Sequence, residues 1–162
     1  MSSNPHPQVP LHESAQLAVL DTNIALDLFL FNDPRIANLR DKIATKQLTW
    51  IATAHMRNEL ERVLAYSHIV AKLNFYEKTA ADILLAFDHH AQLSKAPIAK
   101  SPYTCKDADD QVFIDLACHL AGQTSRDGKI EKVHLISKDK AVLSMRKRLG
   151  KLSVCVSATF SD

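Results

Sequence analysis

The sequence predicts an α/β domain built on a parallel sheet of four to five strands. Short apolar runs without charge alternate along the chain with longer segments of helical character. No Asn-Gly turn joins two of these runs, as a tight hairpin would require. Strands that alternate with helices are typical of parallel sheets, because each connection must carry the chain back to the same edge.

Length and composition agree with one globular unit. The chain has 162 residues, of which 46% are hydrophobic and 23% charged, close to the averages for globular proteins. These values exclude a chain that is disordered throughout, a collagen-like repeat and a coiled-coil rod. There is no window of 18 apolar residues, so we expect no membrane-spanning helix. We expect a single domain over residues 17–162, preceded by a flexible tail over residues 1–16 that lacks the apolar segment of a signal peptide.

The first half of the chain predicts two units of strand followed by helix. Each strand is a short uncharged run, and two helices have recognisable starts. Pro34 suits the first position of a helix, and Thr53 suits an N-cap. The expected elements are a strand over 17–20, helices over 22–31 and 33–46, a strand over 48–51, and a helix over 53–66.

In the second half, two glycines are interpreted as helix stops. Gly122 and Gly150 each follow a segment of helical character, and glycine is favoured just after a helix. Pro97 and Pro102 mark a loop. The expected elements are a long amphipathic helical stretch over 69–93, a loop over 94–106 with a short strand near 92–98, a helix over 107–122, a polar turn over 123–129, a strand over 133–136, a helix over 140–149 and a strand over 152–156.

Acidic residues stand where the predicted strands end. Asp21 directly follows the first strand, Asp139 follows the strand over 133–136, and Asp107, Asp109 and Asp110 open the helix before it. Each could simply cap a helix. In an open α/β sheet, however, the carboxyl ends of the strands border one crevice. Carboxylates about 4 Å apart repel by roughly 1 kcal/mol in water, and more near a protein surface. A divalent cation removes that repulsion, and Mg²⁺ and Mn²⁺ prefer oxygen ligands.

Helical geometry adds one acid to this group and removes another. Glu59 lies at the edge of the apolar stripe that contains Met56 and Leu60. A carboxylate beside a buried stripe needs a partner, either an arginine or lysine or a shared cation. Asp110 projects along the small-residue edge of its helix, whereas Asp115 points elsewhere and is expected to be solvated.

Four segments together resemble the acidic motifs of PIN-domain nucleases. The run Val19-Leu20-Asp21-Thr22-Asn23 resembles the opening strand and first acid, and Glu59 is similar to the second. The segment from Asp107 to Ala117 resembles the D-x-D-D-x-x-F-x-x-x-A motif that carries the third, and Ser137-Lys138-Asp139 resembles the fourth. The resemblance spans roughly residues 17 to 160. It is nearest to the small bacterial PIN proteins that serve as toxins of toxin–antitoxin pairs (VapC-like).

The resemblance implies a three-layer α/β/α fold and a metal-dependent endoribonuclease that cleaves single-stranded RNA. It implies a pocket of three or four acids that holds one or two Mg²⁺ or Mn²⁺ ions. The implied catalytic and metal-binding residues are Asp21, Glu59, Asp110 and Asp139, with Asp107 as a further candidate ligand. The implied hydrogen-bonding residues around the phosphate or the ligands are Thr22, Asn23 and Ser137. In this motif Ser137 replaces the commoner threonine, and Lys138 replaces a frequent glycine.

Charge distribution agrees with a polyanionic partner. The net charge is +2, but residues 126–151 hold nine lysines and arginines and three acids, a local balance of +6. Such a segment is either a solvated helix face or a surface for RNA. Lys138 and Lys140, next to Asp139, are the expected contacts to the RNA backbone.

Other partners and functions remain open at this stage. The PIN resemblance adds a protein antitoxin and a homodimer, with the apolar faces of 69–93 as one surface, and three cysteines without a CxxC pair suggest the reducing cytoplasm. One alternative is a non-catalytic PIN module that binds RNA or protein. Another is a different Mg²⁺-dependent phosphoryl-transfer protein. A receiver domain would require a pair of acids at the end of the first strand, where only Asp21 is present. A phosphatase with an aspartyl nucleophile would require a second acid two residues later, where the residue is Asn23.

Overall fold

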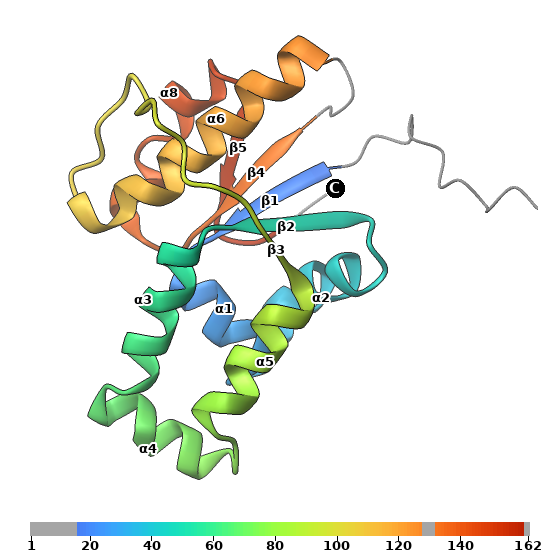
Figure 1. The fold of residues 1–162 in the computed structure, drawn as a ribbon, viewed down its shortest axis with the longest axis vertical. Helices are drawn as coiled ribbons and strands as arrows, with labels where there is room; N and C mark the ends of the chain where they lie inside the picture. The colour runs from blue at the N-terminus through green and yellow to red at the C-terminus, as the bar shows by residue number, and fades with distance from the viewer. Residues whose placement is uncertain (1–15, 128–131, 161–162) are drawn as a thin grey trace, which may run out of the picture.

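The predicted parallel sheet is present in a computed structural model of the chain, which describes residues 16–127 and 132–160 (Figure 1). Five strands, all paired in parallel, lie in the order β3-β2-β1-β4-β5. Their bounds are β1 Gln16–Leu20, β2 Leu48–Ala52, β3 Ala91–Leu93, β4 Val133–Ile136 and β5 Val154–Ser157. The α/β prediction is therefore confirmed. The predicted tail over 1–16 lies outside the described residues, apart from Gln16, which opens β1.

The strand order places a crevice between β1 and β4. Leu17 pairs with Thr49 of β2 on one side and with Val133 of β4 on the other. The chain first moves outward from β1 to β3, and then crosses back to the other side of β1 to enter β4. Connections that leave neighbouring strands in opposite directions open a binding crevice at their carboxyl ends. The residues that follow β1 and β4 therefore border this crevice.

Helices cover both faces of the sheet (Figure 1). One face carries α1 (Thr22–Phe29), α2 (Ala37–Ala44) and α5 (Ala80–His90), and the other carries α6 (Gln111–Asp127) and α8 (Arg146–Gly150). The core between these layers is apolar and includes Trp50, which is 1% exposed. This is the three-layer α/β/α arrangement expected from the sequence.

An arm of helices extends from the carboxyl end of β2. Helix α3 (Ala54–Leu64) begins at Thr53, whose hydroxyl accepts a hydrogen bond from the Met56 backbone N–H at 3.3 Å, so the predicted cap is confirmed. Helix α4 (Ser67–Phe75) follows it and joins α5 at the far end of the arm (Figure 1). The arm holds one face of α3 beside the crevice.

The prediction of one helical stretch over 69–93 was wrong. Helix α4 ends at Phe75, and the backbone of Glu77 adopts a positive φ of 55°. A capping box between Thr79 and Asp82 then starts α5, which leads directly into β3. The apolar periodicity continues across this break, so it could not reveal the turn, whereas the cap residues mark it.

The ends of two further predicted helices differ in the structure. Helix α6 continues past Gly122 to Asp127, and a glycine inside a helix costs only about 1 kcal/mol relative to alanine. Part of the predicted turn over 123–129 is therefore helical, and the rest lies outside the described residues. The predicted helix over 140–149 is divided into α7 (Lys140–Leu143) and α8, and buried Met145 lies at the division.

Two 3₁₀ turns precede longer helices: η1 (Pro34–Ile36) before α2 and η2 (Ala108–Asp110) before α6. Within the described residues, no helix has the length and apolar character needed to cross a membrane.

Candidate metal centre

An open pocket of about 510 Å³ lies at the carboxyl edge of the sheet. Its walls are the loop after β1, one face of α3, the η2–α6 junction and the loop after β4. The residues that line it are Asp21, Thr22, Asn23, His55, Met56, Glu59, Arg62, Val63, Tyr66, Asp107, Ala108, Asp109, Asp110, Val112, Phe113 and Asp139. All four acids predicted as catalytic therefore border the same pocket.

Asp21 occupies the deepest part of this acidic group. It follows β1, is 4% exposed and caps α1, where its Oδ1 accepts a hydrogen bond from the Ile24 N–H at 3.2 Å. Its Oδ2 accepts a hydrogen bond from the Ser137 hydroxyl. Burial raises the pKa of Asp21, and the bonds from Ser137 and the backbone offset part of this rise. Asp21 thus both caps a helix and contributes a carboxylate to the pocket.

Ser137 connects Asp21 to Asp139. The serine is fully buried at the end of β4, and its backbone N–H donates to the Ser157 carbonyl at 3.0 Å. Its Oγ donates to Asp21 and accepts a hydrogen bond from the Asp139 N–H at 3.0 Å. The hydroxyl therefore holds one carboxylate and the backbone of the other in a fixed relation, which is how residues behind a metal site orient its ligands.

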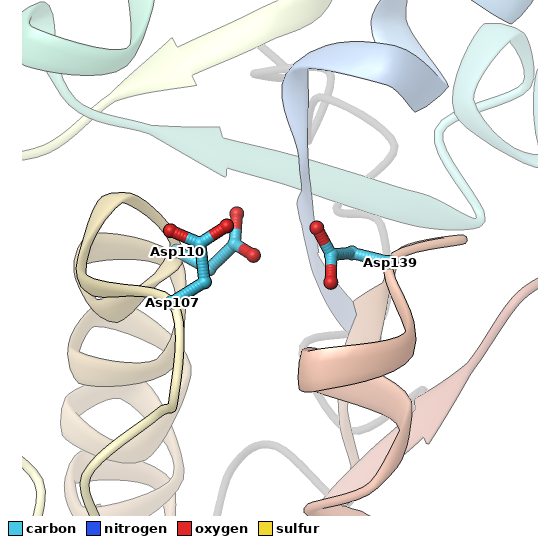
Figure 2. A group of neighbouring side chains, drawn as sticks. All are labelled: Asp107, Asp110 and Asp139. Carbon is cyan, nitrogen blue, oxygen red and sulfur yellow. The ribbon is translucent and has the colours of Figure 1, made fainter.

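Three carboxylates converge closely in the pocket. Asp107, Asp110 and Asp139 each offer one oxygen, and these oxygens lie within 4.8 Å of one another. Figure 2 shows Asp107 and Asp110 reaching from the start of α6 toward Asp139, which follows β4. Local bonds hold two of them, since Asp107 accepts from the Asp109 N–H at 3.0 Å and Asp139 from the Ala141 N–H at 2.8 Å.

Asp110 lacks the partners that a buried carboxylate needs. Its Oδ2 is buried without a hydrogen-bond partner among the described residues. The pKa of Asp110 is raised to about 7. Burial is the largest cause, and the carboxyl of Asp139 and the charges of Asp107 and Asp21 add to it. An unpaired carboxylate among other carboxylates matches the oxygen-rich sites of Mg²⁺ and Mn²⁺. The residues present therefore fit a divalent cation.

Glu59 borders the same pocket from α3 but stands apart from this trio. Its carboxylate forms an ion pair with Arg62, one helical turn later, and its side chain is 34% exposed. The sequence left open whether Glu59 pairs with an arginine or lysine or with a shared cation, and in the structure it pairs with Arg62. Any role of Glu59 toward a metal or a water stays a prediction.

The lysines proposed for RNA contact lie outside the pocket lining. The Lys138 ammonium is 2.5 Å from Oδ2 of Asp27, a buried residue of α1. Lys140 is exposed in the first turn of α7. Successive side chains point in different directions along this segment. The Lys138 side chain reaches α1, whereas Ser137 contacts Asp21 and Asp139 lines the pocket. The RNA-backbone role of both lysines stays a prediction.

One acid was placed wrongly by helical geometry. Asp115 was expected to be solvated, yet it is only partly exposed. Its Oδ1 accepts hydrogen bonds from the Ser101 N–H at 2.8 Å and from the Gln111 side-chain amide at 2.9 Å. It therefore fastens the loop before η2 to α6, a contact that no helical pattern could indicate.

Three pocket residues were missed in the sequence. His55, Arg62 and Tyr66 line the pocket together with Glu59. His55 and Arg62 are four and three residues from Glu59, which is the spacing of one helix face, so Glu59 alone could have pointed to these two. Tyr66 lies beyond the end of α3 as the N-cap of α4, so helical spacing does not indicate it.

The comparisons with known proteins agree with this geometry. The model of a protein family described as PIN domain matches residues 17–124. No curated protein and no solved structure matched the chain significantly. The matched segment runs from β1 into α6 and contains Asp21, Glu59 and Asp110, while Asp139 lies beyond it.

Proposed function

The chain belongs to the PIN-domain family, and from this premise we propose that it is a metal-dependent endoribonuclease that hydrolyses single-stranded RNA. Membership of the family supports a nuclease. One observation carries the metal dependence: three carboxyl oxygens from two distant segments lie within 4.8 Å, and Asp110 has a buried oxygen without a partner. When the three carboxylates are ionised, such a group is stabilised by a cation that compensates their charge.

We assign Asp110, Asp139 and Asp21 as ligands of one or two Mg²⁺ or Mn²⁺ ions, with Asp107 as a further ligand. The contacts of these residues support the assignment, because Ser137 joins Asp21 to Asp139 and Asp139 faces Asp110. When bound, the cation supplies the charge that neutralises the phosphate and activates water for in-line attack. The ion identity is proposed from the all-oxygen donor set.

The remaining pocket residues bind and orient the substrate in this proposal. Glu59 orients the attacking water or adds a ligand, once Arg62 no longer holds it. Thr22 and Asn23 lie in the first turn of α1 and line the pocket, where their side chains can donate hydrogen bonds to a phosphate. Lys140 and Lys138 contact the RNA backbone outside the pocket. The proposal rests more on Lys140, because Lys138 already pairs with Asp27.

A protein partner is the second part of the proposal. We propose that the chain is the toxin of a toxin–antitoxin pair in the cytoplasm, that it binds an antitoxin protein and that it forms a homodimer. Apolar side chains exposed on the helical arm support a protein contact: Val70 and Phe75 on α4, and Leu85 on α5. The three cysteines are free, which agrees with a reducing compartment.

The direct test is cleavage of a short labelled single-stranded RNA with Mn²⁺ or Mg²⁺. We expect internal cuts that disappear with a chelator and in Asp110→Asn. Matched double-stranded RNA and single-stranded DNA of the same sequence serve as controls for substrate class. Binding of RNA without cleavage in either metal would favour the non-catalytic module. Hydrolysis of a phosphomonoester in place of RNA would favour a phosphatase.

A further inference from the structure

We propose that one face of α3, together with Tyr66 at the junction of α3 and α4, is a nucleotide-binding subsite, in which Tyr66 stacks on a base and Arg62 contacts the adjacent phosphate. This inference rests on the proposed ribonuclease function and specifies how that site holds single-stranded RNA. It adds a substrate contact inside the pocket to the RNA-backbone contacts proposed for Lys138 and Lys140 outside it.

The face in question runs along the pocket for the whole length of α3. His55, Glu59 and Arg62 line the pocket at successive turns of α3, and Tyr66 lines it just beyond the end of that helix, as the N-cap of α4. At 1.5 Å per residue, His55 and Arg62 are separated by about 10 Å along the helix axis. The face therefore begins beside the acids and leads outward, as a path for a strand of RNA would.

Charge assigns the phosphate contact to Arg62. Six acids line the pocket: Asp21, Glu59, Asp107, Asp109, Asp110 and Asp139. Among the described residues of the lining, Arg62 is the only lysine or arginine. A phosphodiester that enters an acidic pocket needs a cation beside it, and a guanidinium binds phosphate with two parallel hydrogen bonds. Arg62 is 59% exposed at its side chain and pairs only one turn away with Glu59, so it can turn toward a phosphate.

Tyr66 has the features of a stacking platform. Its side chain lies at the pocket although the residue is 43% exposed. Its backbone is fixed on both sides: the N–H donates to the Val63 carbonyl at 3.0 Å, and the carbonyl accepts from the N–H groups of Ile69 and Val70 at 2.9 and 2.8 Å. A rigidly held aromatic ring with a free surface loses little entropy when a base stacks on it.

Other exposed aromatic residues provide a natural control. Phe75 is 77% exposed and packs edge-on against Tyr76 at the other end of α4. Neither of them lines the pocket. Exposure of an aromatic ring on the arm is thus common, and only Tyr66 combines exposure with a place beside the acids.

The test measures RNA affinity separately from chemistry. Binding of a fluorescein-labelled single-stranded RNA is followed by anisotropy in the Asp110→Asn background, where cleavage is absent. Adding Tyr66→Ala should weaken binding by about 5- to 150-fold, while Tyr66→Phe and the control Tyr76→Ala leave it unchanged. Arg62→Gln should reduce the dependence of affinity on salt by about one ion. Tyr66→Leu, which keeps apolar bulk, should behave as Tyr66→Ala if stacking is the cause.

A spectroscopic readout identifies the stacked base. In an RNA with one 2-aminopurine, fluorescence should be quenched by the protein with tyrosine or phenylalanine at position 66 and not by Tyr66→Leu. The same oligonucleotide as DNA shows whether the subsite distinguishes the sugar. Equal affinity and equal quenching in all variants, with RNA still cut by the unaltered chain, would overturn the subsite and leave the nuclease proposal intact. A chain that neither binds nor cuts RNA would overturn both.

Discussion

Carboxylates outside the pocket and carboxylates inside it have opposite electrostatic surroundings. Asp33 forms an ion pair with Arg35 at 2.6 Å, and the arginine lowers the pKa of that carboxyl to about 2. Asp88 is 2.6 Å from Arg57, which likewise lowers its pKa. In the pocket, burial and neighbouring acids raise the pKa of Asp21 and raise that of Asp110 to about 7.

The difference shows where the fold leaves negative charge uncompensated. Outside the pocket, each of these two acids has an arginine close in space, so its ionised form stabilises the folded protein. Inside, the carboxylates of Asp107, Asp110 and Asp139 meet, and among the described residues none of the three forms an ion pair with a lysine or arginine. Their ionisation opposes folding until a divalent ion binds. The contrast therefore predicts that removing a pocket acid and removing a paired acid have opposite effects on stability.

The largest effect is expected for Asp110→Asn. The substitution removes a ligand and should lower kcat/KM for RNA by more than about 100-fold, since a metal contributes several kcal/mol to transition-state stabilisation. It also removes repulsion with Asp139 and Asp107, so the metal-free variant should have a higher Tm than the unaltered chain. Cleavage assays and calorimetry in chelator measure the two parts. A variant that is both less stable without metal and fully active would contradict the comparison.

The next effect concerns Ser137. Ser137→Ala leaves Oδ2 of Asp21 without its donor, which should cost about 1–3 kcal/mol of stability. Because the hydroxyl also holds Asp139, metal affinity should fall by about 10- to 100-fold. Chemical denaturation and metal titration measure these losses. Ser137→Thr keeps the hydroxyl and should restore both, so a failure of threonine to rescue would show that packing, and not the hydrogen bonds, is responsible.

A smaller effect is the pH dependence of stability. The pKa of Asp110 is about 7 in the folded protein against an ordinary value of 3.8, so the folded protein binds more protons than the unfolded chain between these values. Its contribution to the free energy of unfolding therefore falls as pH rises from about 4 to about 7. The lowered pKa of Asp33 acts in the opposite direction at lower pH: its contribution is lost as pH falls from about 4 to about 2.

Metal binding should reverse the loss at neutral pH. A cation must displace the proton on Asp110, so Mn²⁺ should raise Tm more at about pH 8 than at about pH 5. Thermal scans with and without chelator measure this difference. In Asp110→Asn, the metal effect and its pH dependence should both become small. An equal metal-induced shift at both pH values would mean that Asp110 is not a ligand.

The smallest effect is expected where the carboxylate is paired at the surface. Asp88→Asn breaks the ion pair with Arg57, and both side chains are partly exposed. Such pairs contribute about 0–1 kcal/mol, so the Tm should fall slightly and RNA cleavage should stay unchanged. A loss of cleavage in this variant would show that the arm and the pocket are coupled.

The positions of the main strands along the chain and of the acids that follow them could be predicted because both depend on local sequence. The uncharged runs at 17–20, 48–51 and 133–136 became β1, β2 and β4. The cap at Thr53 was predicted from the residue itself. The break after Leu143 and the continuation past Gly122 were not predicted, because helix ends there depend on packing. The break after Phe75 was missed although the capping box of Thr79 and Asp82 marks it locally.

The partners of single side chains were the least predictable feature. The ion pair of Lys138 with Asp27 was not predicted, and Asp115 was expected in solvent but anchors a loop. Both contacts join residues far apart in the sequence or on different elements. The place of His55 and Arg62 beside Glu59 was predictable in principle, since it depends only on helical spacing, whereas that of Tyr66 depends on the turn between α3 and α4.

The sequence alone determined that acids would stand at the ends of parallel strands, because uncharged runs become buried strands and a polar residue must end each of them. Only the tertiary structure decided which acids meet. The crossover from β3 to β4 brings Asp139 beside Asp21, and the turn at η2 places oxygens of Asp107 and Asp110, and not of Asp109, within 4.8 Å of an Asp139 oxygen. That choice depends on the relative placement of β4 and α6, which no local pattern contains.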